Sequence, residues 1–314
     1  MGYNDSIGRS DVSALIPEQV STSILKNLEN ESAAMNLFTK LPMSTNQTRM
    51  PVLAALPTAY FVTGDTGLKQ TTKLAWSNKY INVEELAAIV PIPEAVFEDL
   101  NFDIWGRVQP LIEQAIARAL DDAIFFGTNK PSSWPDAIVP AAVAASHAVA
   151  RGTNTAGAAG GLAADLNDVF AKVEDDGYDV DMVLANRSYK GRLRNARNGD
   201  GTPYPELSAD SVYGVPVQYP MRGMWPAGTS AAEVVVGNRG EAILGVRGDM
   251  SMKMLDQAVI QNSDGTIQYN LPQQDMVALR VVMRVGFQIA NTINYDQQVE
   301  ANRYPFAVLR SPAS

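Results

Sequence analysis

The most regular pattern of apolar residues in the chain predicts a long amphipathic helix over residues 103–126. Apolar side chains recur at helical spacing, with polar residues between them, and they include Ile104, Val108, Leu111, Ile112, Ala115, Ile116, Ala119, Leu120, Ala123 and Ile124. Asp103 suits the N-cap position and Gly127 the stop. Pro110 lies within the stripe and predicts a kink or an altered start. Such a helix is over ~30 Å long, enough to support a domain.

A second amphipathic pattern predicts a helix over residues 162–177, followed by alternating helical and extended segments. Its apolar face is formed by Leu162, Leu166, Val169, Phe170 and Val173. A short buried strand follows within 178–186, then a helix over 189–197 and extended runs at 212–219, 232–238 and 242–246. This mixture of helices and strands predicts an α+β region with its own core.

Residues 44–82 are rich in threonine and predict a long two-stranded hairpin. The run TAYFV (58–62) and the run LKQTTKLAW (68–76) flank the turn signal Gly64-Asp65-Thr66-Gly67. An isolated hairpin is at best marginally stable in water. We therefore expect it to lie on its own domain or on a neighbour.

Two apolar runs far apart in the chain are expected to pair as strands. The run from Leu86 to Ile92 is strand-like and leads into a short helix predicted after Pro93. The segment DMVALRVVMRVGFQIAN (275–291) alternates and predicts a long strand, with 86–92 as its expected partner, and YPFAVLR (304–310) predicts another.

The remaining segments are less regular. Pro17, Val20, Ile24, Leu28 and Ala34 fit an N-terminal helix that either packs on the body or forms an arm docked on a neighbouring subunit. Residues 128–161, with prolines and then Ala- and Gly-rich stretches, predict irregular chain ending in a mobile loop.

The composition of the chain excludes several classes of catalytic and metal-binding site. The chain has 314 residues, a formal net charge of -9, no cysteine and one histidine. Thiol catalysis, disulfides and cysteine-based metal sites are excluded. Charged residues make up 19%, below the usual ~25%, which hints at subunit contacts. The acidic balance disfavours tight nucleic-acid binding. No signal peptide pattern or membrane-spanning run is evident.

No catalytic, cofactor-binding or metal-binding residue is predicted. Glu84 and Glu85 are adjacent, so their side chains point in different directions and fit a solvated face better than acid–base catalysis. His147 lies in an Ala-rich segment and is interpreted as incidental. The glycines of GNRGEAILGVRG (237–248) do not match a phosphate-binding spacing and are interpreted as turns.

An acidic cluster precedes a basic one in the second half of the chain. The acidic residues are Glu174, Asp175, Asp176, Asp179 and Asp181, and the basic ones are Arg187, Lys190, Arg192, Arg194 and Arg197. They are either two solvated faces or complementary patches that meet between neighbouring copies.

Residues 79–127 resemble the corresponding part of tailed-bacteriophage major capsid proteins of the Hong Kong 97 type. The phrases that carry the resemblance are LAAIVPIPEAVFED (86–99), LDDAIFFG (120–127) and DMVALRVVMRVGFQIAN (275–291). The resemblance covers roughly residues 15–310, and it rests on the order and spacing of these loose patterns.

The resemblance implies an α+β capsid fold in four parts. These are an N-terminal arm (1–43), an extended loop (44–82), a peripheral domain with a spine helix (83–134 and 275–314) and an axial domain (135–274). It also implies a non-enzymatic subunit that forms hexamers and pentamers of an icosahedral shell around double-stranded DNA, without sequence-specific contacts. The expected locations are the virion capsid and, before assembly, the host cytoplasm.

The resemblance also raises expectations about partners and maturation. Many family members carry an N-terminal scaffolding segment of roughly a hundred residues, whereas about forty residues precede the hairpin here. The resemblance therefore implies either a separate scaffolding protein or a fold that assembles without one. A portal is expected as a partner, and a decoration protein is a further candidate. The founding member cross-links a loop lysine to an asparagine beside a glutamate. The residues offered here are Lys69, Lys73 and Lys79, with Asn291, Asn294, Asn302 and Glu300. They do not align with that reaction, and no cross-linking is predicted.

Two alternatives stay open at this point. One is a cellular nanocompartment (encapsulin-like) shell, which shares the fold but encloses an enzyme. The other is a hydrolase or binding protein with its site in residues 135–270, which would need convergent polar residues around a pocket.

Overall fold

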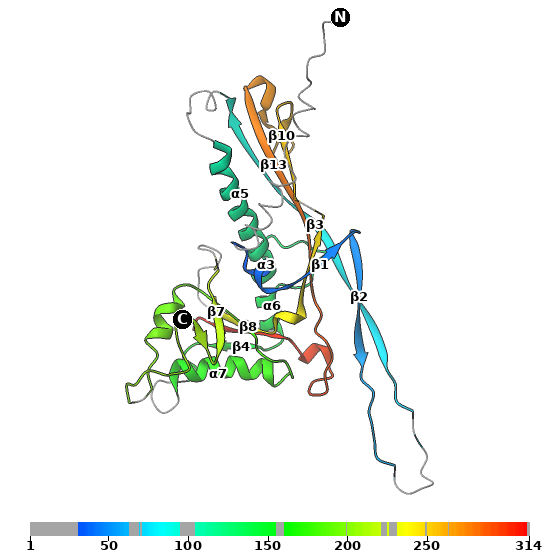
Figure 1. The fold of residues 1–314 in the computed structure, drawn as a ribbon, viewed down its shortest axis with the longest axis vertical. Coiled ribbons are helices and arrows are strands. Elements are labelled where there is room, and N and C mark those ends of the chain that lie inside the picture. Colours follow the sequence, from blue (N-terminus) through cyan, green and yellow to red (C-terminus); the bar gives the residue numbers. More distant parts are fainter. Residues whose placement is uncertain are drawn as a thin grey trace, which may run out of the picture.

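Two six-stranded sheets organise an elongated molecule (Figure 1). The computed structural model describes residues 31–62, 69, 71–94, 104–154, 160–198, 200–220, 225, 231–248, 250–262 and 264–312. The helices are α3 (Ala33–Leu37), α5 (Ile104–Asp121), α6 (Ile138–Ala144), α7 (Gly161–Glu174) and α8 (Tyr189–Arg194), with short helical turns η1 (Asp122–Phe126), η2 (Arg239–Glu241), η3 (Leu271–Gln273) and η4 (Glu300–Asn302). The strands are β1 (Thr39–Met43), β2 (Gln47–Ala55), β3 (Ala75–Pro93), β4 (Ala148–Ala150), β5 (Met182–Ala185), β6 (Ser211–Val212), β7 (Val215–Gln218), β8 (Ala232–Gly237), β9 (Ala242–Arg247), β10 (Ser251–Leu255), β11 (Val259–Gln261), β12 (Ile267–Asn270), β13 (Met276–Ile289) and β14 (Phe306–Arg310).

The first sheet is built on the pairing that the sequence predicts. Its order is β1-β9-β13-β3-β2, with β10 also on β13. Strand β13 runs antiparallel to β3 from the pair Met276–Pro93 to the pair Gly286–Val83. The predicted 86–92 strand is therefore confirmed, but it is part of a 19-residue strand that begins inside the predicted hairpin.

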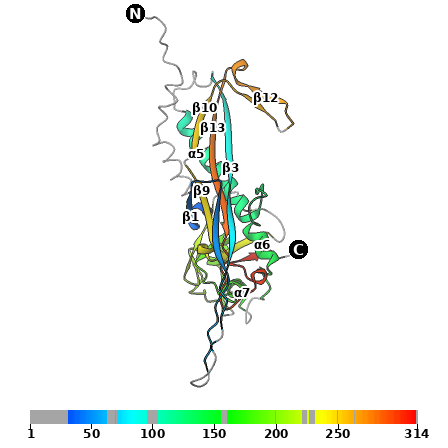
Figure 2. The same cartoon turned by 90° about the vertical axis from the view of Figure 1, so that its right-hand side faces the viewer.

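Helix α5 covers one face of this sheet, and the two together are called the elongated layer (Figures 1 and 2). Alternation places Leu86, Ala88 and Val90 of β3 against the core, whereas Glu85 and Ile89 are exposed. Helix α5 contributes Ile112, Ile116 and Leu120, all buried. The helix continues through Pro110 and then through the π-helical turn η1 to Gly127, whose φ of +78° ends it as predicted. Asp103 lies outside the described residues.

The second sheet separates two hydrophobic cores and is called, with its helices, the globular lobe. Its order is β4-β14-β8-β5-β7-β6. Alternate residues of β14 face opposite sides, so Phe306 and Val308 join the core shared with α5 and α6, while Ala307 and Leu309 join the core under α7. The first core thus runs without a break from the elongated layer into the globular lobe.

The elements predicted for the globular lobe are largely confirmed. Helix α7 ends before Gly177, whose φ is +78°. Helix α8 and strands β5 and β8 fall within the predicted ranges, and β9 extends one residue beyond its range, to Arg247. The predicted extended run 212–219 is a tight hairpin instead, because Tyr213 and Gly214 both have positive φ and turn the chain between β6 and β7.

The prediction that residues 128–161 are irregular is wrong, and the N-terminal region holds a strand that no pattern predicted. Residues 128–161 contain α6 and the strand β4, which pairs in parallel with β14. The Ala-rich composition gives no clear helical pattern, yet α6 forms there and its Ile138 and Ala142 are fully buried. The N-terminal region contains β1, which pairs in parallel with β9, a partner about 200 residues away.

Some expectations fall outside the described residues. The short helix predicted between Pro93 and residue 100 falls outside them from residue 95 onward. The predicted N-terminal helix falls outside them over 17–30, and its last apolar position, Ala34, belongs to the short helix α3. The proposed domain boundaries remain a prediction. The sheets share strands across them, since β9 and β10 join the first sheet and β14 joins the second.

Candidate assembly surfaces

A two-stranded arm, formed by β2, the paired first half of β3 and the adjoining residues 56–62 and 71–74, projects from the body (Figures 1 and 2). The hairpin predicted over 44–82 is confirmed from the pair Gln47–Asn82 to the pair Ala55–Ala75, whereas residues 56–62 and 71–74 carry no regular strand. Several of its large apolar side chains are exposed. Phe61 is fully exposed and Trp76 is 62% exposed, and Tyr60, Val62, Leu74 and Tyr80 are also exposed. A cluster of this kind on a projecting element marks an interaction site.

The root of the arm is tightly packed around two glycines. Gly245 of β9 and Gly286 of β13 are directly paired. A Cβ on Gly245 would clash with Met43 and Ile81, and one on Gly286 would lie 2.7 Å from the carbonyl oxygen of Asn82. Ile81 fills this space and is completely buried. The interpretation of Gly245 as a turn residue, made from the sequence, is wrong, because this glycine lies within strand β9.

The loop 290–304 braces the arm from the side. Lys79 of β3 donates to the carbonyl oxygen of Ile289 and pairs with Glu300, with Nζ 2.9 Å from Oε1. The Tyr295 hydroxyl donates to the carbonyl oxygen of Pro57 at 2.9 Å. The brace joins residues about 210–240 positions apart, so only the folded chain creates it.

A buried polar cluster holds this loop against the globular lobe. Arg303 is 3% exposed and donates to the Tyr178 hydroxyl and to the carbonyl oxygens of Asn291 and Gln297. Burial is the main reason that the pKa of Tyr178 is raised well above its ordinary value. The Asp176 carboxylate accepts a hydrogen bond from the backbone N–H of Tyr304.

His147 belongs to the same region and is structural. It is buried, with Nε2 3.2 Å from Asp176 and Nδ1 3.3 Å from the carbonyl oxygen of Phe306. The interpretation of His147 as incidental is therefore wrong, because it links α7's end to β14. It does not form a catalytic triad, and the described residues contain no group of three or more metal-ligating side chains.

A second buried carboxylate anchors the chain that precedes β1. Asp121, at the end of α5, accepts hydrogen bonds from Ser32 Oγ and from the backbone N–H groups of Ala33 and Ala34 at 2.7–3.0 Å. Desolvation raises the pKa of Asp121 to about 6, although these three hydrogen bonds oppose the rise. The N-terminus of α3 is thereby held on the spine of the molecule.

The other residues considered for acid–base catalysis or cross-linking do not come together in one site. Glu84 accepts from the Ser133 hydroxyl, while Glu85 pairs with Arg284 on the neighbouring strand, so the two carboxylates do not converge. Of the lysines considered for cross-linking, Lys79 is held by Glu300. Asn291 and Asn294 are hydrogen-bonded within the lobe.

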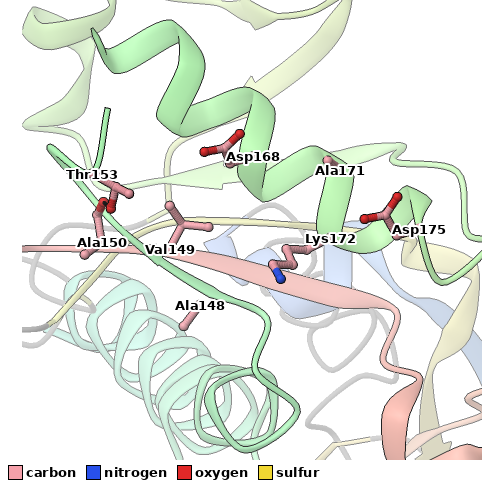
Figure 3. A pocket seen from close by; sticks show the side chains of 8 residues that line it. All are labelled: Ala148, Val149, Ala150, Thr153, Asp168, Ala171, Lys172 and Asp175. Atoms are coloured by element: carbon pink, nitrogen blue, oxygen red, sulfur yellow. Dashed lines mark hydrogen bonds between the residues drawn. The ribbon is translucent and has the colours of Figure 1, made fainter. Parts of the chain in front are cut away.

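The globular lobe carries an open hollow of about 400 Å³ between β4 and α7 (Figure 3). Ala148 and Val149 of β4 and Ala171 of α7 line it, and Asp168 and Asp175 project from α7 and its end. Among the described lining residues, the Thr153 hydroxyl donates to the carbonyl oxygen of Ala150 and not to a base. Within the part of the chain that the structure describes, no helix is long and apolar enough to cross a membrane.

Comparisons with known proteins agree with this fold. The chain matches the phage capsid family over residues 13–293. It is 24% identical to the major capsid protein of Staphylococcus phage 80alpha over 290 residues, covering 91% of this chain and 85% of that protein. A structure from Microbacterium phage Oxtober96 is 38% identical with a TM-score of 0.78, covering 98% of this chain and 99% of the other. A structure from Mycobacterium phage Cain is 33% identical with the same TM-score, covering 98% of each chain.

The chain therefore belongs to the phage capsid family, and as a major capsid protein it is a self-assembling structural component of the virion rather than an enzyme. The expected α+β capsid fold is confirmed. The comparisons do not favour a cellular nanocompartment, nor a hydrolase with its site in the globular lobe.

Proposed function

We propose that the protein assembles as hexamers and pentamers that close into an icosahedral shell around double-stranded DNA. The observation that carries this proposal is the arm, whose exposed aromatic side chains lie beyond the packed body of their own subunit. The arm is the extended loop expected from the sequence, and it reaches over a neighbouring subunit, where Phe61 and Trp76 become buried.

An arm of this kind stabilises an assembly because its contact is repeated in every copy of the subunit. Each copy both donates an arm and receives one, so many modest contacts add up around a ring and over a closed shell. Burial of a large aromatic side chain contributes ~2–3 kcal/mol. Phe61 and Trp76 of one arm together contribute about 4–6 kcal/mol. This is comparable to the low end of the cost of association, about 4–15 kcal/mol, so the contacts must be summed over many copies.

The charge of the chain suits a container for DNA. With 25 Lys and Arg against 34 Asp and Glu, the subunit repels packaged DNA on average. Contacts with the DNA are proposed to be without sequence specificity. A portal, a separate scaffolding protein and a decoration protein are proposed as further partners. The subunit is proposed to reside in the host cytoplasm before assembly, and the four-part division into arm, loop, peripheral and axial domains is proposed with it.

Removal of the tip of the arm tests the proposal. A variant lacking residues 58–74, with the cut ends joined by a short glycine-rich turn, should fold with an unchanged circular dichroism spectrum but form no closed particles in cryo-electron micrographs. A full-length control with Lys73→Ser keeps the apolar side chains and should form shells. Closed shells from the deletion variant would contradict the role of the arm.

A further inference from the structure

Some residues of the acidic cluster over 174–181 form side-chain ion pairs or hydrogen bonds within the subunit, and others do not. Asp176 contacts His147 and Tyr304, and Asp181 pairs with Arg239. Glu174 and Asp175 are exposed and form no ion pair within the described residues. They stand at the C-terminal end of α7, where the helix dipole disfavours negative charge. Local stability therefore does not explain why carboxylates occupy these two positions.

Asp175, together with Asp168 of α7, lines the hollow between β4 and α7 (Figure 3), and Glu174 is the residue before it in the chain. Strand β4 is the edge of the second sheet, so the hollow opens at the side of the lobe. Ala148 and Val149 of β4 and Ala171 of α7 give it apolar lining that suits the methylene stem of a long side chain, and Asp168 and Asp175 suit a cationic head. Lys172 also lines the hollow and repels a second cation, but the two carboxylates outnumber it.

The basic cluster over 187–197 also contains both paired and unpaired residues. Lys190 forms an ion pair with Asp210, and Arg192 forms one with Glu233. Arg187 and Arg194 are exposed and form no ion pair within the parts of the chain that the structure describes. Strand β5, which is buried throughout, lies between the two clusters in the sequence, because the acidic residues precede it and the basic residues follow it. The unpaired charges therefore stand on different segments of the lobe, the acidic ones at the end of α7 and the basic ones just after β5 and at the end of α8.

We propose that, within one ring of subunits, Arg187 and Arg194 of each copy dock at the acidic hollow of the next copy. This inference rests on the proposed assembly into rings and identifies the contact that closes them. A contact between two different patches is heterologous, and it generates a ring when the rotation between copies closes. Opposite charges at its two sides fix the order and direction of the subunits.

Charge reversal on each side provides a test. The Arg-reversed variant carries Arg187→Glu and Arg194→Glu, and the acid-reversed variant carries Glu174→Lys and Asp175→Lys. Each variant alone presents like charges at every contact, so its yield of rings, measured by native mass spectrometry, should fall at least about tenfold. The acid reversal places cations at the end of α7, where the dipole favours them, so unfolding cannot explain its loss of rings.

Mixing the two variants gives the sharpest readout. Opposite charges then meet only where the variants alternate around the ring, and alternation closes only with an even number of subunits. The mixture should form hexamers but no pentamers, whereas a variant with all four reversals should recover both. The control Lys253→Glu, an exposed cation on β10, should assemble like the wild type.

The outcomes separate this inference from the proposed function. If the wild type forms rings but the Arg-reversed variant does so equally well, or the mixture also forms pentamers, the docking contact is wrong and ring assembly stands. If the wild type forms no rings at all, the proposed function fails and the contact fails with it. Rings from the mixture in even numbers only support both.

Discussion

The two halves of β3 belong to the same strand but have opposite environments. From Val83 to Pro93 the strand pairs with β13, and α5 covers one face of it. Its side chains alternate between the core and solvent. From Ala75 to Asn82 it pairs with β2 alone in the arm, and Trp76, Ser77 and Asn78 are all exposed. A single strand thus carries both the stability of the subunit and its means of contact with others.

The difference shows where the free energy of each half comes from. The packed half is stabilised within one subunit by burial of apolar area. The projecting half exposes apolar side chains that gain nothing until another surface covers them. Substitutions in the first half should therefore affect folding, and substitutions in the second should affect assembly.

The largest effect is expected where the packed layer receives a charge. Ile116 of α5 is 2% exposed, and Ile116→Asp buries an unpaired carboxylate at a cost of more than about 4 kcal/mol. The variant should be insoluble on expression. Ala115→Asp, on the exposed face of the same helix turn, is the matched control and should stay soluble. Normal particles from Ile116→Asp would show that the packing of α5 is wrongly assigned.

A pair of phenylalanines compares the two regions directly. Phe287 of β13 is 1% exposed, and Phe287→Ala should lower the free energy of unfolding by about 3–5 kcal/mol. Phe61→Ala on the arm should change the unfolding free energy by less than about 0.5 kcal/mol, yet reduce shell formation. Denaturant unfolding and particle counts measure the two quantities. Equal destabilisation by both substitutions would contradict the comparison.

Asp121 should give the packed region a pH dependence that the arm lacks. Its folded pKa of about 6 exceeds the ordinary value of 3.8, so between these two values the folded state binds more protons than the unfolded state. The unfolding free energy should therefore fall by about 3 kcal/mol as the pH rises from about 4 to 6, and then level off.

Unfolding of unassembled subunits across that pH range measures this contribution. Asp121→Asn should flatten the slope, since the amide does not titrate, whereas the exposed control Asp136→Asn should keep it. An unchanged slope in Asp121→Asn would show that another group titrates.

The smallest effect concerns the brace between the two regions. Glu300 is 65% exposed in its pair with Lys79, so a double-mutant cycle of Lys79→Met and Glu300→Gln should give a coupling of about 0.5 kcal/mol. Because the brace fixes the arm's direction more than it stabilises the fold, shell yield should fall more than stability does. A coupling of several kcal/mol would instead assign the pair to the packed core.

The parts of the fold that follow a local period were predictable. Helices α5 and α7 each present an apolar stripe at helical spacing, and β13 alternates over 14 residues. These patterns record which face of an element is buried, and they do so whatever the partner. The arm was predictable in its existence, because threonine-rich runs flank a glycine turn, but not in its exposure.

The assembly surfaces were only partly predictable. The acidic and basic clusters are evident in the sequence, but which members pair internally depends on distant residues such as Glu233 and Tyr304. The buried roles of His147 and Asp121 left no local signal, since each contacts residues roughly 30–160 positions away.

The sequence by itself determined the secondary structure with strong periodicity, the absence of cysteine chemistry, and the pairing of 86–92 with the long C-terminal strand. Only the tertiary structure decided that β14 joins the globular lobe, that β1 joins β9, and that a glycine pair and a lateral brace direct the arm. The physical reason is that periodicity is a property of neighbouring residues. Pairing, burial of single polar groups and exposure of the arm depend on which distant segments the folded chain brings together.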